Sequence, residues 1–250
     1  MIMLTPVKMS DSIPSTELCS LDIDSSIARI TLRREDVFNA LNVQLISELV
    51  SILDWTKDRS VGKTGVLNDD EGKPFFRVIV LRSDGKHFCA GADINMMRDA
   101  GAASAEENRV DSERLDRLFN SLWAHPCFTI GAVQGVALGG GAGLVACVDH
   151  SIGEYRTRIA LSEGKLGILP AVIGPYVYRR LGSAQFRRLS MLASRVGAEE
   201  ALRIGWLDEL VESPLDFDQA IQRIISDVLS TGPMAVAESK RLSLTFDDWK

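Results

Sequence analysis

The sequence predicts an α/β fold, a spiral of ββα units with a helical C-terminal part. Strand-like apolar runs alternate with glycine-rich turns and helical segments down to about Asp149, which favours stacked ββα units over a doubly wound sheet. From Gly174 onward the apolar periodicity is helical. We therefore divide the chain into a flexible N-terminal tail at 1–16, a spiral core at 17–173 and a helical region at 174–250.

The core is predicted to begin with a β-hairpin and a helix. Residues 18–23 and 27–32 are strand-like and are separated by a short polar turn. Residues 43–55 carry apolar side chains at helical spacing. Residues 58–74 contain three glycines and an acidic triplet, so we expect a solvated loop there.

The pattern then repeats along the chain. Residues 77–82 are typical of a buried strand, residues 105–123 of an amphipathic helix that cannot run past Pro126, and residues 128–133 of a second buried strand. The helical segments expected after Gly174 are 175–181, 184–193, 198–204, 217–229 and 233–244.

Composition excludes several classes of protein. The 250 residues are 46% hydrophobic and 25% charged, as in a globular domain, and no run approaches the roughly 20 apolar residues that a membrane span needs. The net charge of −6 argues against nucleic-acid binding, and the first twenty residues lack signal or transit patterns, so we expect a cytoplasmic protein. Four cysteines and three histidines are scattered without ligand spacing, so we expect reduced core thiols and no metal site.

Two strand-to-helix turns have the composition of an anion site. One is Phe88–Asp93, and the other is the glycine triplet Gly139 to Gly141 at the mouth of an apolar helix. Unpaired amides in the first turn of a helix, together with the positive end of its dipole, favour negative charge. Two such turns can hold one oxyanion between them, although the glycines could also serve tight packing alone.

Four sequence blocks, taken in order, resemble the crotonase (enoyl-CoA hydratase/isomerase) superfamily. The blocks are Asn39-Ala40-Leu41-Asn42, Phe88-Cys89-Ala90-Gly91-Ala92-Asp93, Val136-Ala137-Leu138-Gly139-Gly140-Gly141 and Glu163-Gly164-Lys165-Leu166-Gly167-Ile168-Leu169-Pro170. Within the superfamily, Leu161-Ser162-Glu163 and the segment from Pro170 to Val177 are most similar to bacterial methylglutaconyl-CoA hydratases.

The resemblance implies an acyl-CoA substrate and assigns roles to particular residues. The amides of Ala92 and Gly140 would hold the thioester oxygen, and Glu163 would transfer the proton. The substrate-binding set that it implies comprises Ala90, Gly91, Ala92, Asp93, Ile94, Gly140, Gly143, Arg33, Arg34 and Lys240. For Asp93 and Asp149 as additional acids we favour structural roles.

The chain departs from two-carboxylate hydratases of the family at Gly143, where they carry a second glutamate. Glu163 is then the only acid–base group that the resemblance places, as in single-glutamate isomerases. A methylglutaconyl substrate would also need a cation for its distal carboxylate, for which Arg179 and Arg180 are candidates.

These observations lead to a principal functional hypothesis and two alternatives. The first is hydration of an α,β-unsaturated acyl-CoA, with 3-methylglutaconyl-CoA of leucine catabolism as the specific candidate. The alternatives are an enoyl-CoA delta isomerase and a catalytically silent acyl-CoA- or RNA-binding relative. The resemblance also implies that no cofactor is needed beyond the CoA of the substrate, and that the chain forms a homotrimer or a dimer of trimers. The helical C-terminal region looks shorter than in relatives.

Overall fold

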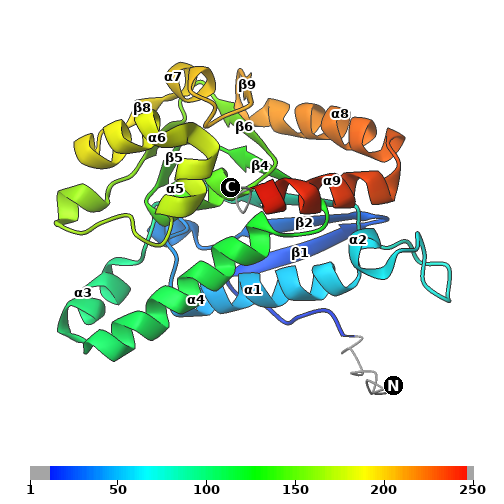
Figure 1. Ribbon diagram of the computed structural model, residues 1–250, viewed down its shortest axis with the longest axis horizontal. Coiled ribbons are helices and arrows are strands. Elements are labelled where there is room, and N and C mark those ends of the chain that lie inside the picture. The colour runs from blue at the N-terminus through cyan, green and yellow to red at the C-terminus, as the bar shows by residue number, and fades with distance from the viewer. Residues whose placement is uncertain (1–11, 247–250) are drawn as a thin grey trace.

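The computed structural model describes residues 12–246, and within them two β-sheets are surrounded by nine α-helices (Figure 1). Most of the predicted tail at 1–16 therefore lies outside the described residues. The alternating strands and helices form the α/β spiral that the sequence predicts.

The larger sheet has six strands in the order β1-β2-β3-β4-β6-β9. Its strands are β1 (Cys19–Asp24), β2 (Ile27–Leu32), β3 (Val78–Ser83), β4 (Phe128–Val133), β6 (His150–Glu154) and β9 (Glu209–Val211). β1 and β2 form the predicted antiparallel hairpin, and all other neighbours are parallel. Parallel strands need long crossovers, which the helices supply.

The larger sheet is covered on both faces, because its central strands are apolar on both sides. In β3, Ile79 and Leu81 join the core that holds α1 (Val43–Asp58) and α4 (Ala105–Trp123), whereas Val78 and Val80 pack with α8 (Phe217–Ser230). A near-continuous apolar run is what a parallel strand buried on both faces requires. Figure 1 shows α1 and α4 together on one side of the sheet and α8 on the other.

A second sheet gives the fold its spiral. It consists of β5 (Val136–Leu138), β7 (Arg158–Ala160) and β8 (Val196–Gly197), and Cys89 extends it through a parallel bridge to Ala137. The chain thus passes from β4 to β5 and from β6 to β7, adding one strand to each sheet per turn. The ends of the second-sheet strands on successive turns lie side by side.

Six further helices lie within the described residues. They are α2 (Val61–Thr64), α3 (Ile94–Ala102), α5 (Gly140–Cys147), α6 (Gly174–Leu192), α7 (Ala198–Arg203) and α9 (Pro233–Thr245). Helix α4 has the predicted bounds, and the Ser104–Glu107 capping box fixes its start. The two segments predicted at 175–181 and 184–193 both lie within α6 and are separated by a break at Gly182, whose φ of 75° and ψ of 168° are not helical.

Two predictions of local structure were wrong. The segment 58–74 is not wholly a solvated loop: Ser60 is fully buried and caps α2 by accepting from the amide of Lys63. The region after Gly174 is not wholly helical either, since it adds β8 to the second sheet and β9 to the first. All four cysteines are free and buried, which confirms the prediction of core thiols.

Candidate active site

A mostly apolar cavity of about 310 Å³ lies where the predicted site residues converge. It is lined by Leu41, Ile46, Ala90, Gly91, Ala92, Met96, Met97, Ser112, Leu115, Gly139, Gly140, Ser162, Glu163, Leu166 and residues 168–173. Five predicted residues meet here: Ala90, Gly91, Ala92, Gly140 and Glu163. An apolar cavity with a few polar groups is the common form of a small-molecule site.

The two strand-to-helix turns lie against each other, as an oxyanion site requires. The amide of Cys89 donates to the carbonyl of Val136 at 3.1 Å, and the amide of Leu138 donates to the carbonyl of Cys89 at 3.0 Å. The close approach of the two backbone turns depends on glycine. A Cβ on Gly91, where φ is 98°, would lie 2.9 Å from the Leu138 carbonyl oxygen, and one on Gly141 would lie 2.3 Å from that of Cys89.

The amides of Ala92 and Gly140 are free to donate into the cavity. Leu41 forms a parallel bridge with Ala92 by donating to the Gly91 carbonyl and accepting from the Asp93 amide, so the Ala92 amide points away from Leu41. Gly140 is the first residue of α5. Within residues 12–246, neither amide has a hydrogen-bond acceptor. Both amides are therefore available as hydrogen-bond donors to a ligand in the cavity.

Glu163 begins the 3₁₀ helix Glu163–Leu166 and extends its carboxylate over the glycine turn. A Cβ built on Gly139 would crowd the carboxylate at 3.3 Å from Glu163 Oε1, and the φ of 48° at this position favours glycine. Glu163 Oε2 is buried and has no partner among the described residues. Burial raises the pKa of this carboxyl above its usual range, which suits a group that must both take and give a proton.

Arg34 and Asp93 support the turn that carries Ala92. Arg34 Nη2 lies 2.7 Å from Asp93 Oδ2, with side-chain exposures of only 17% and 9%, and Arg34 Nη1 donates to the carbonyl of Ala40 at 2.8 Å. Asp93 Oδ1 accepts from the amide of Asn95. The Arg34 guanidinium and these hydrogen bonds outweigh desolvation and hold the pKa of Asp93 below its usual value. Both residues are thus engaged with each other.

Gly143 lies behind the wall of the cavity. It is fully packed, and a Cβ there would lie 2.6 Å from Ile173 Cγ2 and 3.0 Å from Phe119 Cε1. Gly143 is not among the residues that line the cavity, and its direct contact with substrate stays a prediction. Ile173, 2% exposed, fills the space in front of it.

Five other predicted substrate contacts are absent from the cavity lining, namely Arg34 and Asp93, described above, and Ile94, Arg33 and Lys240. Ile94 is 80% exposed, and Arg33 is on the surface beside Asp84, with its Nε 3.4 Å from Asp84 Oδ2. Lys240 pairs with Asp149 at 2.7 Å and donates to the carbonyl of Cys127. Lys240 is therefore a structural cation in this chain.

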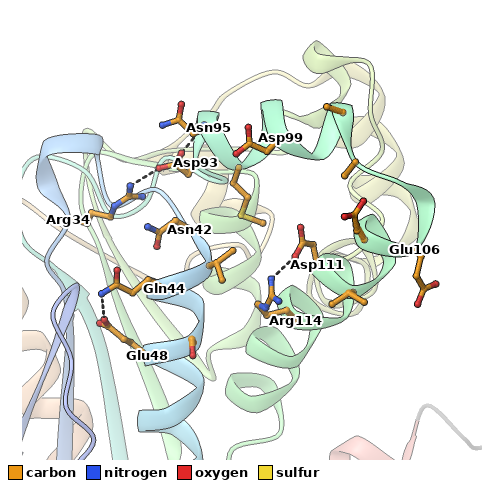
Figure 2. Close-up of a pocket in the computed structure, with 17 residues that line it drawn as sticks. Arg34, Asn42, Gln44, Glu48, Asp93, Asn95, Asp99, Glu106, Asp111 and Arg114 are labelled. Atoms are coloured by element: carbon orange, nitrogen blue, oxygen red, sulfur yellow. Dashed lines mark hydrogen bonds and ion pairs between the residues drawn. The ribbon is translucent and has the colours of Figure 1, made fainter.

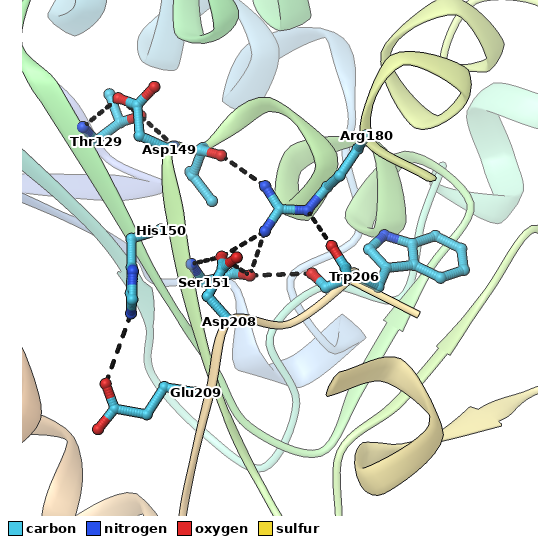
Figure 3. Close-up of polar contacts among 10 residues, drawn as sticks. Thr129, Asp149, His150, Ser151, Arg180, Trp206, Asp208 and Glu209 are labelled. Atoms are coloured by element: carbon cyan, nitrogen blue, oxygen red, sulfur yellow. Dashed lines mark hydrogen bonds and ion pairs between the residues drawn. The ribbon is translucent and has the colours of Figure 1, made fainter. Parts of the chain in front are cut away.

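Arg180 is not available for a distal substrate carboxylate. It donates to the carbonyls of Val148 and Gly205 and to Ser151 Oγ, and it pairs with Asp208 (Figure 3). The same figure shows Asp149 accepting from Thr129, which supports the structural role favoured for Asp149. The sequence alone could not show whether Arg180 and Asp149 would contact distant residues of the chain or a ligand.

Figure 2 shows the side chains that line a larger groove of about 1320 Å³. Met96 lines both this groove and the cavity. Its charged lining is mainly acidic, and its two arginines, Arg34 and Arg114, are already paired with Asp93 and Asp111. An acidic lining repels phosphates. We therefore locate the chemistry in the smaller cavity, which holds Glu163 and the two amides.

Sequence reasoning missed several residues that line the cavity. Met96 and Met97 on α3, and Leu115 on α4, form an apolar wall, and Ser112 and Ser162 add hydroxyls. Helical periodicity predicts an inward face for α4 but does not show which cavity it borders. Ser162 could have been found from its position directly before Glu163.

The sequence matches the Enoyl-CoA hydratase/isomerase family over residues 22–242. This chain belongs to the enoyl-CoA hydratase/isomerase family. It is 31% identical to the crotonyl-CoA hydratase of Syntrophomonas wolfei over 222 residues, 88% of this chain and 78% of that protein.

Solved structures agree with this assignment. An enoyl-CoA hydratase from Shewanella pealeana has a TM-score of 0.83 and 34% identity, covering 94% of this chain and 82% of that one. AtuE of Pseudomonas aeruginosa has a TM-score of 0.82 and 34% identity, covering 92% and 83%. The chain is therefore an enzyme of the hydro-lyase type that characterises this family.

No helix between residues 12 and 246 has the length and apolar character needed to cross a membrane. In the same part of the chain, no group of three or more potential metal-binding side chains converges.

Proposed function

We propose that this enoyl-CoA hydratase/isomerase family member adds water to short 2-enoyl-CoA thioesters. The observation that carries the proposal is the convergence of two unpaired amides, Ala92 and Gly140, with the buried carboxyl of Glu163 on one apolar cavity. Preorganised amides are worth about 3 kcal/mol each to a developing oxyanion. The CoA arrives with the substrate, and family members generally need no other cofactor.

In this mechanism the thioester oxygen lies between the two amides. Water adds to Cβ, and the π electrons move onto the thioester as an enolate that the amides stabilise. Glu163 accepts the proton of the water and delivers a proton to Cα, so its carboxylate is regenerated. Arg33, which is at the surface with its side chain 57% exposed, is our candidate for a phosphate of CoA.

The cavity favours an uncharged acyl chain. Among the described residues that line it, there is no lysine, arginine or histidine, and burying a second carboxylate without a cation is costly. We therefore propose crotonyl-CoA as the first substrate to test. 3-Methylglutaconyl-CoA is the second, supported by the similarity of Leu161–Glu163 and of the segment from Pro170 to Val177 to hydratases of that substrate.

Isomerisation of a 3-enoyl-CoA is the alternative reaction. It needs one carboxyl group to move a proton between carbons, and Glu163 is the only carboxylate among the described residues that line the cavity. A relative from Mycosarcoma maydis bears the name enoyl-CoA isomerase/hydratase and is 26% identical over 233 residues.

One assay separates these activities. Hydration removes the absorbance of the conjugated thioester of crotonyl-CoA or 3-methylglutaconyl-CoA, isomerisation creates it from a 3-enoyl-CoA, and a silent binder does neither. Glu163→Gln should lower either activity by about 10²-fold or more while the variant still folds. Turnover of Glu163→Gln above about half that of wild type would refute the assignment of Glu163.

We further propose that the protein assembles as a homotrimer or a dimer of trimers. An apolar hollow of about 560 Å³ at the start of α6 is bordered by strongly exposed side chains, including Leu169 at 81% and Met191 at 79%. Large exposed apolar patches mark interaction surfaces. Light scattering should give a trimer or hexamer mass, and Met191→Glu should reduce it; a monomeric wild type would refute this assembly.

A further inference from the structure

The wall of the cavity at Gly143 cannot hold a water molecule by polar contacts. Ile173 and Phe119 fill the space in front of Gly143 with apolar atoms, the nearest 2.6 Å from where a Cβ would stand. In relatives with a second glutamate at this position, a carboxylate is available for the attacking water. If this chain hydrates enoyl thioesters, another group must take the second hydrogen bond of that water.

Two serines are the neutral polar side chains on the cavity lining, and they differ in their hydrogen bonds. Ser112 already donates to the carbonyl of Asn108 within α4, at 2.8 Å. Ser162 lines the same cavity, and its hydroxyl has no partner among the described residues. Ser162 is thus the hydroxyl that is available to a ligand.

Ser162 also lies at the same end of the second sheet as Ala92 and Gly140. Cys89 bridges to Ala137, and Ala137 pairs with Ile159 across the second sheet. Three residues beyond each of these partners come Ala92, Gly140 and Ser162. Ser162 therefore leaves the sheet at the level of the two oxyanion amides, one strand further along.

The hydroxyl of Ser162 and the carboxylate of Glu163 approach the same point. A Cβ built on Gly139 would lie 3.3 Å from Glu163 Oε1 and 3.5 Å from Ser162 Oγ. Gly139 has no side chain, so this space opens on the cavity that both residues line. The Ser162 and Glu163 oxygens thus border the same part of the cavity beside Gly139, where a water molecule has both of them as neighbours.

We propose that Ser162 is a further catalytic residue, which binds the attacking water together with Glu163; this rests on the proposed hydratase function. The water donates one hydrogen to Ser162 Oγ and the other to the Glu163 carboxylate, and this leaves a lone pair directed at Cβ. The new O–Cβ bond forms as the second hydrogen passes to Glu163, and Cα receives a proton from the same carboxyl group. Water is thereby added across the double bond and neither side chain is altered.

The test compares two reactions of each variant. Hydration of crotonyl-CoA needs the bound water, whereas exchange of the Cα hydrogens of butyryl-CoA with D₂O needs only Glu163 and the amides. Ser162→Ala should lower hydration about tenfold, the effect of losing one hydrogen bond, and change exchange by less than about twofold. Ser162→Thr should restore hydration, and the matched control Ser112→Ala should leave the ratio of the two rates unchanged.

The results that overturn the proposal are distinct from failure of the function itself. If Ser162→Ala hydrates crotonyl-CoA at the wild-type rate, Ser162 does not bind the water. The same conclusion follows if the variant loses hydration and exchange equally. Wild-type protein that performs neither reaction, or Glu163→Gln that retains both, refutes the proposed function instead.

Discussion

Substitution of Gly143 by glutamate tests how the single-carboxylate site is built. The new Cβ would stand 2.6 Å from Ile173 Cγ2 and 3.0 Å from both Ile173 Cβ and Phe119 Cε1, closer than side chains normally pack. Overpacking of this kind costs about 1–3 kcal/mol. For a chain of this size each kcal/mol lowers Tm by roughly 2–4 °C, so Gly143→Glu should lower Tm by roughly 2–12 °C.

The second variant relieves the contact. Ile173→Gly alone removes a buried side chain and should also destabilise, by about 2–5 kcal/mol. Combined with Gly143→Glu, it opens space for the new side chain, so the double variant should be more stable than the sum of the two losses by about 0.5–3 kcal/mol. Crotonyl-CoA hydration should be higher in the double variant than in Gly143→Glu.

Thermal unfolding of the four proteins and their crotonyl-CoA kinetics make up the assay. Additive losses of stability, or a Gly143→Glu protein as stable as wild type, would show that Ile173 does not occupy the place of the second carboxylate. If glutamate is tolerated at position 143, that result would also support direct contact between this position and the substrate.

Three other perturbations address the rest of the site. The value of kcat/KM for hydration should fall as the pH is lowered, because only the ionised form of Glu163 accepts a proton. Because burial raises the pKa of Glu163, the midpoint of this fall should lie above the pKa of about 4.3 of an ordinary glutamate, and a midpoint at that ordinary value would contradict the prediction. Gly140→Pro removes one oxyanion donor and should lower turnover by about 10²-fold, so near-normal turnover by a folded variant would exclude Gly140. Arg34→Ala leaves the carboxylate of Asp93 buried without its ion pair and should cost about 3 kcal/mol in thermal unfolding; a loss below about 1 kcal/mol would show that the pair is not structural.

Local pattern was sufficient to predict most of the elements. The hairpin turn, the capping box of α4 and the run of apolar residues in β3 are each set by residues close together in sequence. The error at 58–74 has the same origin, since Ser60 caps a single helical turn that is too short to give a periodic signal. The short strands β8 and β9 gave no alternating pattern because they have only two and three residues.

The site was less predictable where it depends on distant partners. Lys240, Arg180 and Arg33 look equivalent in the sequence as cations. In the fold, Lys240 is paired with Asp149, Arg180 with Asp208 and three backbone or hydroxyl acceptors, and Arg33 is at the surface. The glycine turns could be predicted because close approach of two backbone segments requires glycine, which is visible in the sequence.

The spiral explains how such a site can change its chemistry without losing its oxyanion donors. The turns that carry Ala92 and Gly140 are joined by main-chain hydrogen bonds between Cys89 and its neighbours in β5, and the amide of Gly139 donates to Ala160 of β7 at 2.9 Å. None of these bonds involves a side chain, so substitutions at Gly143, Ser162 or Ile173 can alter the polarity and shape around Cβ while the donor geometry persists. Substitutions at these three positions should therefore change the rate of water addition without changing the activation of the thioester, which depends on the backbone amides alone.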